Sequence, residues 1–162
     1  MNKKSFDKLV EMLVPGANAL AISSFSKFMD RHSELKIVNP KEWDFFVTVA
    51  GISVGLVGLA DKVVSDDEYE RLSKILSSKI IKWNSNGEHA LGDLMSHMAK
   101  HRESMINLPP DEATKMWAAM LSSWCLLNLK MEIPKDKPSD LMIELGMFLI
   151  VSFKDWWSGN NN

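Results

Sequence analysis

The stretch that most constrains this chain is the uncharged segment Phe45–Ala60. Its sixteen residues lie between Asp44 and Asp61 and carry no charged side chain, so a folded structure has to bury most of them. A helix that crosses a bilayer needs about 20 apolar residues, and this run is shorter and closely bounded by charges. The pattern therefore favours a buried core helix over a membrane span.

The overall composition is that of one globular domain. A chain of 162 residues has ordinary domain length and buries about 70% of its unfolded surface on folding, so it needs no disulfide or structural metal. The net charge of −2 does not provide the basic surface that nucleic acid requires. The single Cys125 stands among apolar residues, as expected of a small buried thiol in a reducing compartment. The first residues lack the apolar run of an export signal, so we expect a cytoplasmic protein. From the net charge we expect that it does not bind nucleic acid.

Apolar residues recur at helical spacing along almost the whole chain, and no stretch alternates as a strand does. The pattern predicts an all-α fold: a single-domain bundle of about seven helices over residues 1–157, with a central apolar helical hairpin. Residues 158–162 are expected to form a disordered tail. The expected helices span residues 5–14, 17–35, 40–62, 65–83, 88–106, 110–130 and 139–157. The most apolar of these, 40–62, 110–130 and 139–157, are placed in the centre.

Short motifs indicate where these helices begin and end. Asn39, Ser65 and Ser139 directly precede expected helices, and side chains of these types cap helix N-termini. Pro15-Gly16 is expected to separate the first two helices, because proline lacks the N–H that a helix interior requires.

The expected central helix carries a seam of small and polar side chains. At 100° per residue its apolar side chains cover most of the circumference, and the seam occupies a stripe roughly 80° wide. The seam consists of Asp44, Thr48, Gly51, Gly55, Gly58 and Lys62. Each interior glycine costs a helix about 1 kcal/mol relative to alanine, so the seam needs a compensating interaction. We predict that another helix approaches closely there, and we keep open the alternative of a groove for a ligand or a partner helix.

Acidic residues gather in the turn that follows the central helix. Asp61, Asp66, Asp67 and Glu68 lie within ten residues of one another. Clustered carboxylates can hold a hard divalent cation such as Ca²⁺ or Mg²⁺, although the spacing is not that of an EF-hand loop. A capping box and the helix dipole also account for acids at these positions, and this is the favoured interpretation. Both interpretations are carried forward.

The segment Leu59-Ala60-Asp61-Lys62-Val63-Val64-Ser65-Asp66-Asp67-Glu68 resembles the corresponding turn of tellurite-resistance TerB-like domains. The shared pattern is an apolar helix, Ala-Asp, a short turn with a buried aliphatic residue, and Ser-x-x-Glu opening the next helix. Lys62 stands where that family usually has glycine. The resemblance implies an all-α fold, metal binding in the turn with Asp61 and Glu68 as the main positions, and a role in stress response or in interaction at the membrane.

A second candidate site lies on the expected helix 88–106. His89, Asp93, His97 and His101 recur every four residues, and a Leu/Met stripe runs along another face. Two imidazoles at i and i+4 can share a metal ion, and a carboxylate can add a ligand or orient a ring. His89 and Asp93 lie opposite the Leu/Met stripe, so most of this face is expected to be solvated. His97 and His101 form the best metal-binding pair, with an acid from another segment or Asp93 as the further ligand.

These patterns are consistent with three functional hypotheses. The first is a non-enzymatic module that binds a protein partner or a small ligand, with a divalent ion at the acidic turn and a link to stress response. The second is a metal-dependent helical enzyme that uses the His/Asp set. The third is a protein that associates with the membrane surface through the hairpin that contains Phe45–Ala60. A homodimer is compatible with each. The eleven methionines are expected to pack the core, although Met-rich faces also suit adaptable binding grooves.

Overall fold

Every element that the structure describes is a helix. The computed structural model of the chain describes residues 3–62 and 65–158, with side chains from residue 6 onward. In chain order the elements are α1 (Lys3–Arg31), the 3₁₀ helix η1 (Ser33–Ile37), α2 (Pro40–Ala60), α3 (Asp66–Trp83), α4 (Gly87–Ala99), α5 (Arg102–Ile106), α6 (Pro110–Asn128), α7 (Asp140–Phe153) and the 3₁₀ helix η2 (Trp156–Ser158). The prediction of an all-α bundle of about seven helices is confirmed. The expected tail lies outside the described residues except for Ser158, which ends η2.

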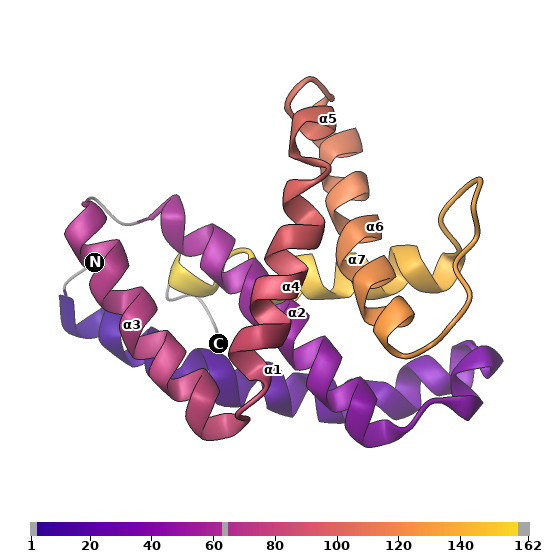
Figure 1. Cartoon of the computed structure of the whole chain (residues 1–162), viewed down its shortest axis with the longest axis horizontal. Helices are drawn as coiled ribbons and strands as arrows, with labels where there is room; N and C mark the ends of the chain where they lie inside the picture. The colour runs from indigo at the N-terminus through magenta and orange to yellow at the C-terminus, as the bar shows by residue number, and fades with distance from the viewer. Residues whose placement is uncertain (1–2, 63–64, 159–162) are drawn as a thin grey trace.

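Helix α2 is the centre of the bundle. It packs against α1, α4, α6 and α7, and α6 packs along α7. Trp43, Ile52 and Leu59 on α2 are fully buried, and a buried side chain of this size contributes about 1.5 to 3 kcal/mol of hydrophobic stabilisation. In Figure 1 the long α1 runs beneath α2, and α3 lies beside α1 at the left. The predicted central position of the helix expected over 40–62 agrees with the contacts of α2, and the two other apolar helices, α6 and α7, pack against it and along each other.

The expected break at Pro15-Gly16 is wrong, because α1 continues as one helix of 29 residues. An interior proline removes one helical hydrogen bond and costs about 3 kcal/mol. Two contacts brace this point: the indole N–H of Trp156 donates to the Leu9 carbonyl at 3.0 Å, and its ring covers Gly16. Pro15 itself is exposed, while Leu13 and Val14 beside it are buried. Packing of the apolar face thus outweighs the local signal to stop.

Three other expected helix ends also differ from the structure. The helix expected over 17–35 ends at Arg31, where His32 adopts an extended conformation and η1 then buries Leu35. The helix expected over 88–106 is interrupted between α4 and α5, where the His101 N–H bonds the Met98 carbonyl. Helix α5 has no buried residue, so tertiary packing does not hold it in line with α4. The last helix ends at Phe153, and η2 turns Trp157 back onto α2.

The glycine seam of α2 is covered by neighbouring helices. A Cβ atom at Gly51 would lie 2.7 Å from the Phe153 ring of α7, and one at Gly55 would lie 2.9 Å from Leu13 of α1. At Gly58 the nearest atom is the Lys154 carbonyl oxygen, 3.1 Å away. The three glycines therefore allow close packing, and the compensation for their helix cost is this packing.

The predicted caps are confirmed. The Asn39 side chain accepts from the Lys41 N–H at 2.9 Å, and Ser65 accepts from the Glu68 N–H at 3.3 Å. Ser139 likewise accepts from the third N–H of α7 at 3.3 Å. Each cap satisfies one N–H that the first helical turn leaves without a partner.

Two of the described helices are long and apolar enough to cross a membrane, as judged by length and composition. They are Phe6–Arg31 and Pro40–Ala60, and 33% and 61% of their most apolar windows are buried inside the fold. The core helix of a globular protein passes the same test, and the larger buried share belongs to α2, which is the core helix here.

Candidate functional site

The acidic turn predicted as an ion site is only partly within the described residues, because residues 63–64 fall outside them. Asp61 directly follows α2, and Asp66, Asp67 and Glu68 form the first turn of α3, where the helix dipole favours negative charge. Nowhere in residues 3–62 and 65–158 do three or more His, Cys, Asp or Glu side chains gather closely enough to hold a metal ion. The divalent ion at this turn stays a prediction.

The histidine set on α4 is divided by the fold. His97 and His101 lie together, with ring centroids 5.9 Å apart, and His97 Nε2 lies 3.3 Å from Ser123 Oγ. Burial lowers the pKa of His97, and the nearby His101 lowers it further. Asp93 is occupied elsewhere, since its Oδ2 accepts a hydrogen bond of 2.8 Å from the indole N–H of Trp124. The pair therefore has no third ligand among the described residues.

Asp44 lies at the N-terminal end of the glycine seam of α2 and is half-buried. Burial raises the pKa of its carboxyl group. Its main-chain carbonyl accepts a hydrogen bond from the Thr48 hydroxyl. The seam as a whole is a packing surface in the described structure, with Gly51, Gly55 and Gly58 in contact with α1, α7 and η2.

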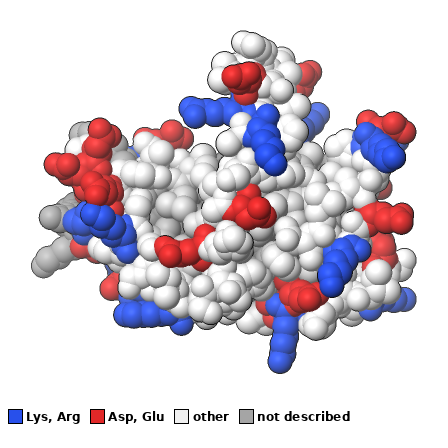
Figure 2. Space-filling view, viewed as in Figure 1, with Lys and Arg blue, Asp and Glu red and all other residues white. Residues whose placement is uncertain are grey.

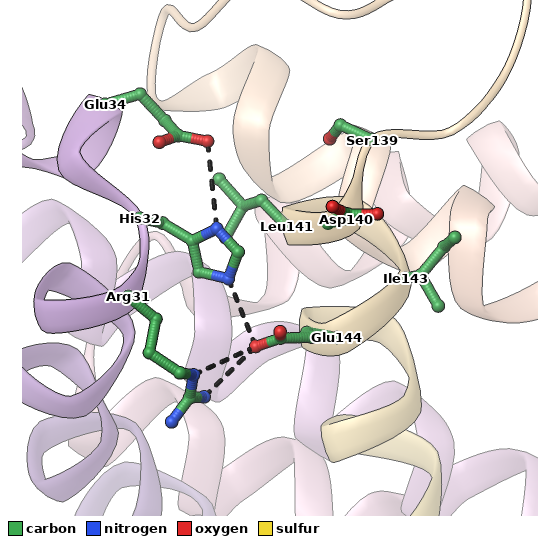
Figure 3. A pocket seen from close by; sticks show the side chains of 8 residues that line it. All are labelled: Arg31, His32, Glu34, Ser139, Asp140, Leu141, Ile143 and Glu144. Carbon is green, nitrogen blue, oxygen red and sulfur yellow. Dashed lines mark hydrogen bonds and ion pairs between the residues drawn. The ribbon is translucent and has the colours of Figure 1, made fainter.

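A polar cavity of about 550 Å³ lies between the end of α1 and the start of α7 (Figure 3). Glu144 Oε2 accepts a hydrogen bond from Arg31 Nε at 3.2 Å and forms an ion pair with Nη2 at 3.1 Å, and His32 Nε2 lies 3.1 Å from the same oxygen. The other ring nitrogen of His32 is 3.9 Å from Glu34. The hydrogen bond to His32, and then that to Arg31, lowers the pKa of Glu144.

The ion pairs of this cluster connect two helices. Its positive and negative groups already pair with one another, so the cluster ties α1 to α7 and leaves little charge for a ligand. One signal in the sequence pointed to it: Glu144 is the only charged residue in the apolar stretch 141–153. Its partners were not identifiable, because they lie more than 100 positions away, at 112 and 113 residues.

A second cavity, of about 490 Å³, is mostly apolar. It lies where α5 and the adjoining ends of α4 and α6 form an arm that projects from the body, beside the end of α2 (Figure 1). Its lining consists of Leu56, Val57, Ala60, Asp61, Tyr69, Met95, Met98, Ala99, Arg102, Met105, Trp117 and Met120. We call it the methionine cavity, because four of the twelve lining residues are methionine.

One residue of the lining carries a buried polar atom without a partner. The indole N–H of Trp117 is buried and has no hydrogen-bond partner among the described residues. Buried donors in native proteins nearly always have an acceptor, so an orphaned one calls for an explanation. Arg102 and Asp61 are the only charged residues of the lining, and both are exposed. In Figure 2 the arm carries both basic and acidic side chains, and acidic side chains gather at the left end over the start of α3.

The sequence carried part of the signal for this cavity. The methionines were expected to pack the core, and all three in the expected helix 88–106, Met95, Met98 and Met105, line the cavity. Met95 remains 38% exposed, which is more than a core position allows. The partners from α2, α3 and α6 were not predictable from local spacing.

Comparisons with known proteins find no matching family model, no similar curated protein and no similar solved structure. The resemblance of Leu59–Glu68 to TerB-like domains stays a prediction.

Proposed function

We propose that this chain is a non-enzymatic, all-α module that binds a small, mainly apolar ligand in the methionine cavity. The observation that carries the proposal is the cavity itself: about 490 Å³ lined by residues of five helices and open to solvent, inside the range of about 300 to 1,000 Å³ typical of small-molecule sites. Such sites combine apolar walls with a few placed polar groups, and this lining has that composition.

The side chains of the lining support an adaptable site. Methionine is unbranched and polarisable, so it repacks around ligands of different shape at little cost. Met95, Met98, Met105 and Met120 come from three separate helices and meet at this cavity. An acceptor on a ligand that reaches the buried indole nitrogen of Trp117 would give this donor a partner.

The test is a titration of the protein, labelled with ¹³C at the methionine methyl groups, with 1-decanol. We expect the signals of the four cavity methionines to shift together and saturate, while those of the remaining seven of the eleven stay in place. Ala99→Phe fills the cavity with an added ring and should abolish these shifts. Ala19→Phe is the matched control, because Ala19 is also exposed on a helix and lines neither the polar cavity nor the methionine cavity.

Two results would contradict the proposal. One is the absence of saturable shifts in the wild-type protein. The other is retention of the shifts in Ala99→Phe, which would mean that decanol binds elsewhere.

A further inference from the structure

A third cavity, of about 330 Å³, lies where the N-terminal halves of α2 and α4 meet the end of α6. Its lining consists of Phe45, Phe46, Asn86, His89, Ala90, Asp93, Trp124 and Asn128. It shares no lining residue with the methionine cavity, so a ligand bound here is independent of the proposed function.

The walls of this cavity are aromatic rings set nearly at right angles. The rings of Phe45 and Phe46 are 5.1 Å apart at 80°, and those of Phe46 and Trp124 are 5.5 Å apart at 78°. Trp83 stacks behind Phe45 at 5.5 Å with a 12° tilt, which holds that ring in place. The lining therefore contains three aromatic rings that contact one another.

The electrostatics of the cavity favour a cation. Asp93 is the only permanently charged residue of the lining, and no lysine or arginine contributes to it. Its carboxylate is oriented by the 2.8 Å hydrogen bond from the Trp124 indole, which also removes the one indole donor from competition. The Asn128 amide nitrogen donates to the Trp124 carbonyl at 2.8 Å, so its side-chain oxygen remains as a further acceptor.

From these contacts we propose that the Phe45–Phe46–Trp124–Asp93 cavity binds an alkylated ammonium group. A cation over an aromatic face is attracted by the ring quadrupole, and several rings with one carboxylate are the usual means of recognising quaternary ammonium. The small volume suits a trimethylammonium head, which is carried by free choline-like molecules and by methylated lysine side chains. The shared chemistry of these two sources is the head group. The same geometry gives Asp93 a role as counter-ion for an organic cation in place of the metal-ligand role considered from the sequence.

The experiment monitors the indole N–H signals of the six tryptophans by ¹⁵N NMR during titration with choline. We expect the signals of Trp124 and Trp83 to shift. We also expect choline to bind at least about tenfold more tightly than 3,3-dimethyl-1-butanol, which has the same shape without the charge. Asp93→Asn should weaken choline binding about fivefold and leave the neutral alcohol unchanged. Asp136→Asn, an exposed loop acid outside the cavity, is the matched control.

Titration with Nα-acetyl-trimethyl-lysine amide separates the two sources. Tighter binding of this probe indicates a methylated protein, and tighter binding of choline indicates a free small molecule. The proposal is overturned if choline leaves the Trp124 signal unmoved or if the neutral alcohol binds as tightly. This comparison uses the wild-type chain, so it decides the question even if Asp93→Asn fails to fold.

Discussion

The indole N–H of Trp157 donates a hydrogen bond to the main-chain carbonyl of Gly55, 102 residues earlier in the chain. The Trp157 ring also lies against Gly58, where an added Cβ would be 3.4 Å from it. Trp157 is 1% exposed, so both contacts are made inside the core. The C-terminal η2 is thereby joined to the middle of α2, at the point where glycine leaves room for a large ring.

The joining of η2 to α2 gives a first prediction. Trp157→Ala should lower the free energy of unfolding by about 3 to 5 kcal/mol, because it removes a large buried ring and leaves a cavity. Urea denaturation measures the change. Ile37→Ala is the control: this side chain is 84% exposed, so the expected change is within about 0.5 kcal/mol. A similar small loss in both variants would mean that η2 does not contribute to the core.

Two glycines in comparable helices should respond in opposite directions to alanine. A Cβ at Gly146 of α7 would overlap the backbone of Ala118 in α6, which has no flexible end to move aside. Gly146→Ala should therefore cost about 3 kcal/mol. At Gly92 on α4 nothing lies within 4 Å, so Gly92→Ala should gain about 1 kcal/mol from helix propensity alone. Thermal melts of the two variants provide the measurement, and melting temperatures that shift in the same direction would contradict the packing of α6 on α7.

The end of α6 stores a small strain. Lys130 has a φ of 59°, the only positive value at a non-glycine position among the described residues. The N–H of Met131 bonds the Leu126 carbonyl at 2.9 Å, as in the helix ends that glycine usually closes. Lys130→Gly should raise the free energy of unfolding by about 1 kcal/mol. Lys130→Ala keeps the unfavourable side chain and should show no such gain in the same denaturation experiment.

The Arg31–His32–Glu144 cluster predicts a dependence of stability on acid pH. The folded pKa of Glu144 lies below its ordinary value, chiefly through the hydrogen bond to His32, so folding favours the ionised carboxylate. This contribution is present above the ordinary pKa and is lost as the pH falls through the folded pKa. Glu144→Gln should lower the melting temperature at neutral pH and leave it nearly unchanged at low pH. Because Glu144 is 42% exposed, we expect a small effect.

A parallel series of melts with Glu132→Gln serves as the control for Glu144→Gln. Glu132 is an exposed loop residue, and its variant should follow the wild-type curve. If the melting temperature of Glu144→Gln also follows the wild-type dependence on pH, the cluster has no influence on stability.

Local features accounted for most helix positions. The Asn39 and Ser65 caps act within three residues, and the uncharged run that forms α2 predicts its own burial, so neighbouring residues were enough to place these elements. The expected break at Pro15 failed because the contacts that override it come from Trp156, at the far end of the chain. The expected helix 88–106 failed for the opposite reason, since α5 has no buried residue to continue the line of α4.

The candidate sites show the same division. Residues within one helix, such as His97 and His101, were placed together by their spacing, and the fold keeps them together. The three cavities draw their walls from helices far apart in the chain, and no local pattern contains the angle at which those helices meet. The sequence by itself determined the helices, their caps and the apolar core helix, because these depend on side chains a few residues apart. Only the tertiary structure decided where Asp93, Trp117 and Glu144 find or lack partners, because that depends on packing between distant segments.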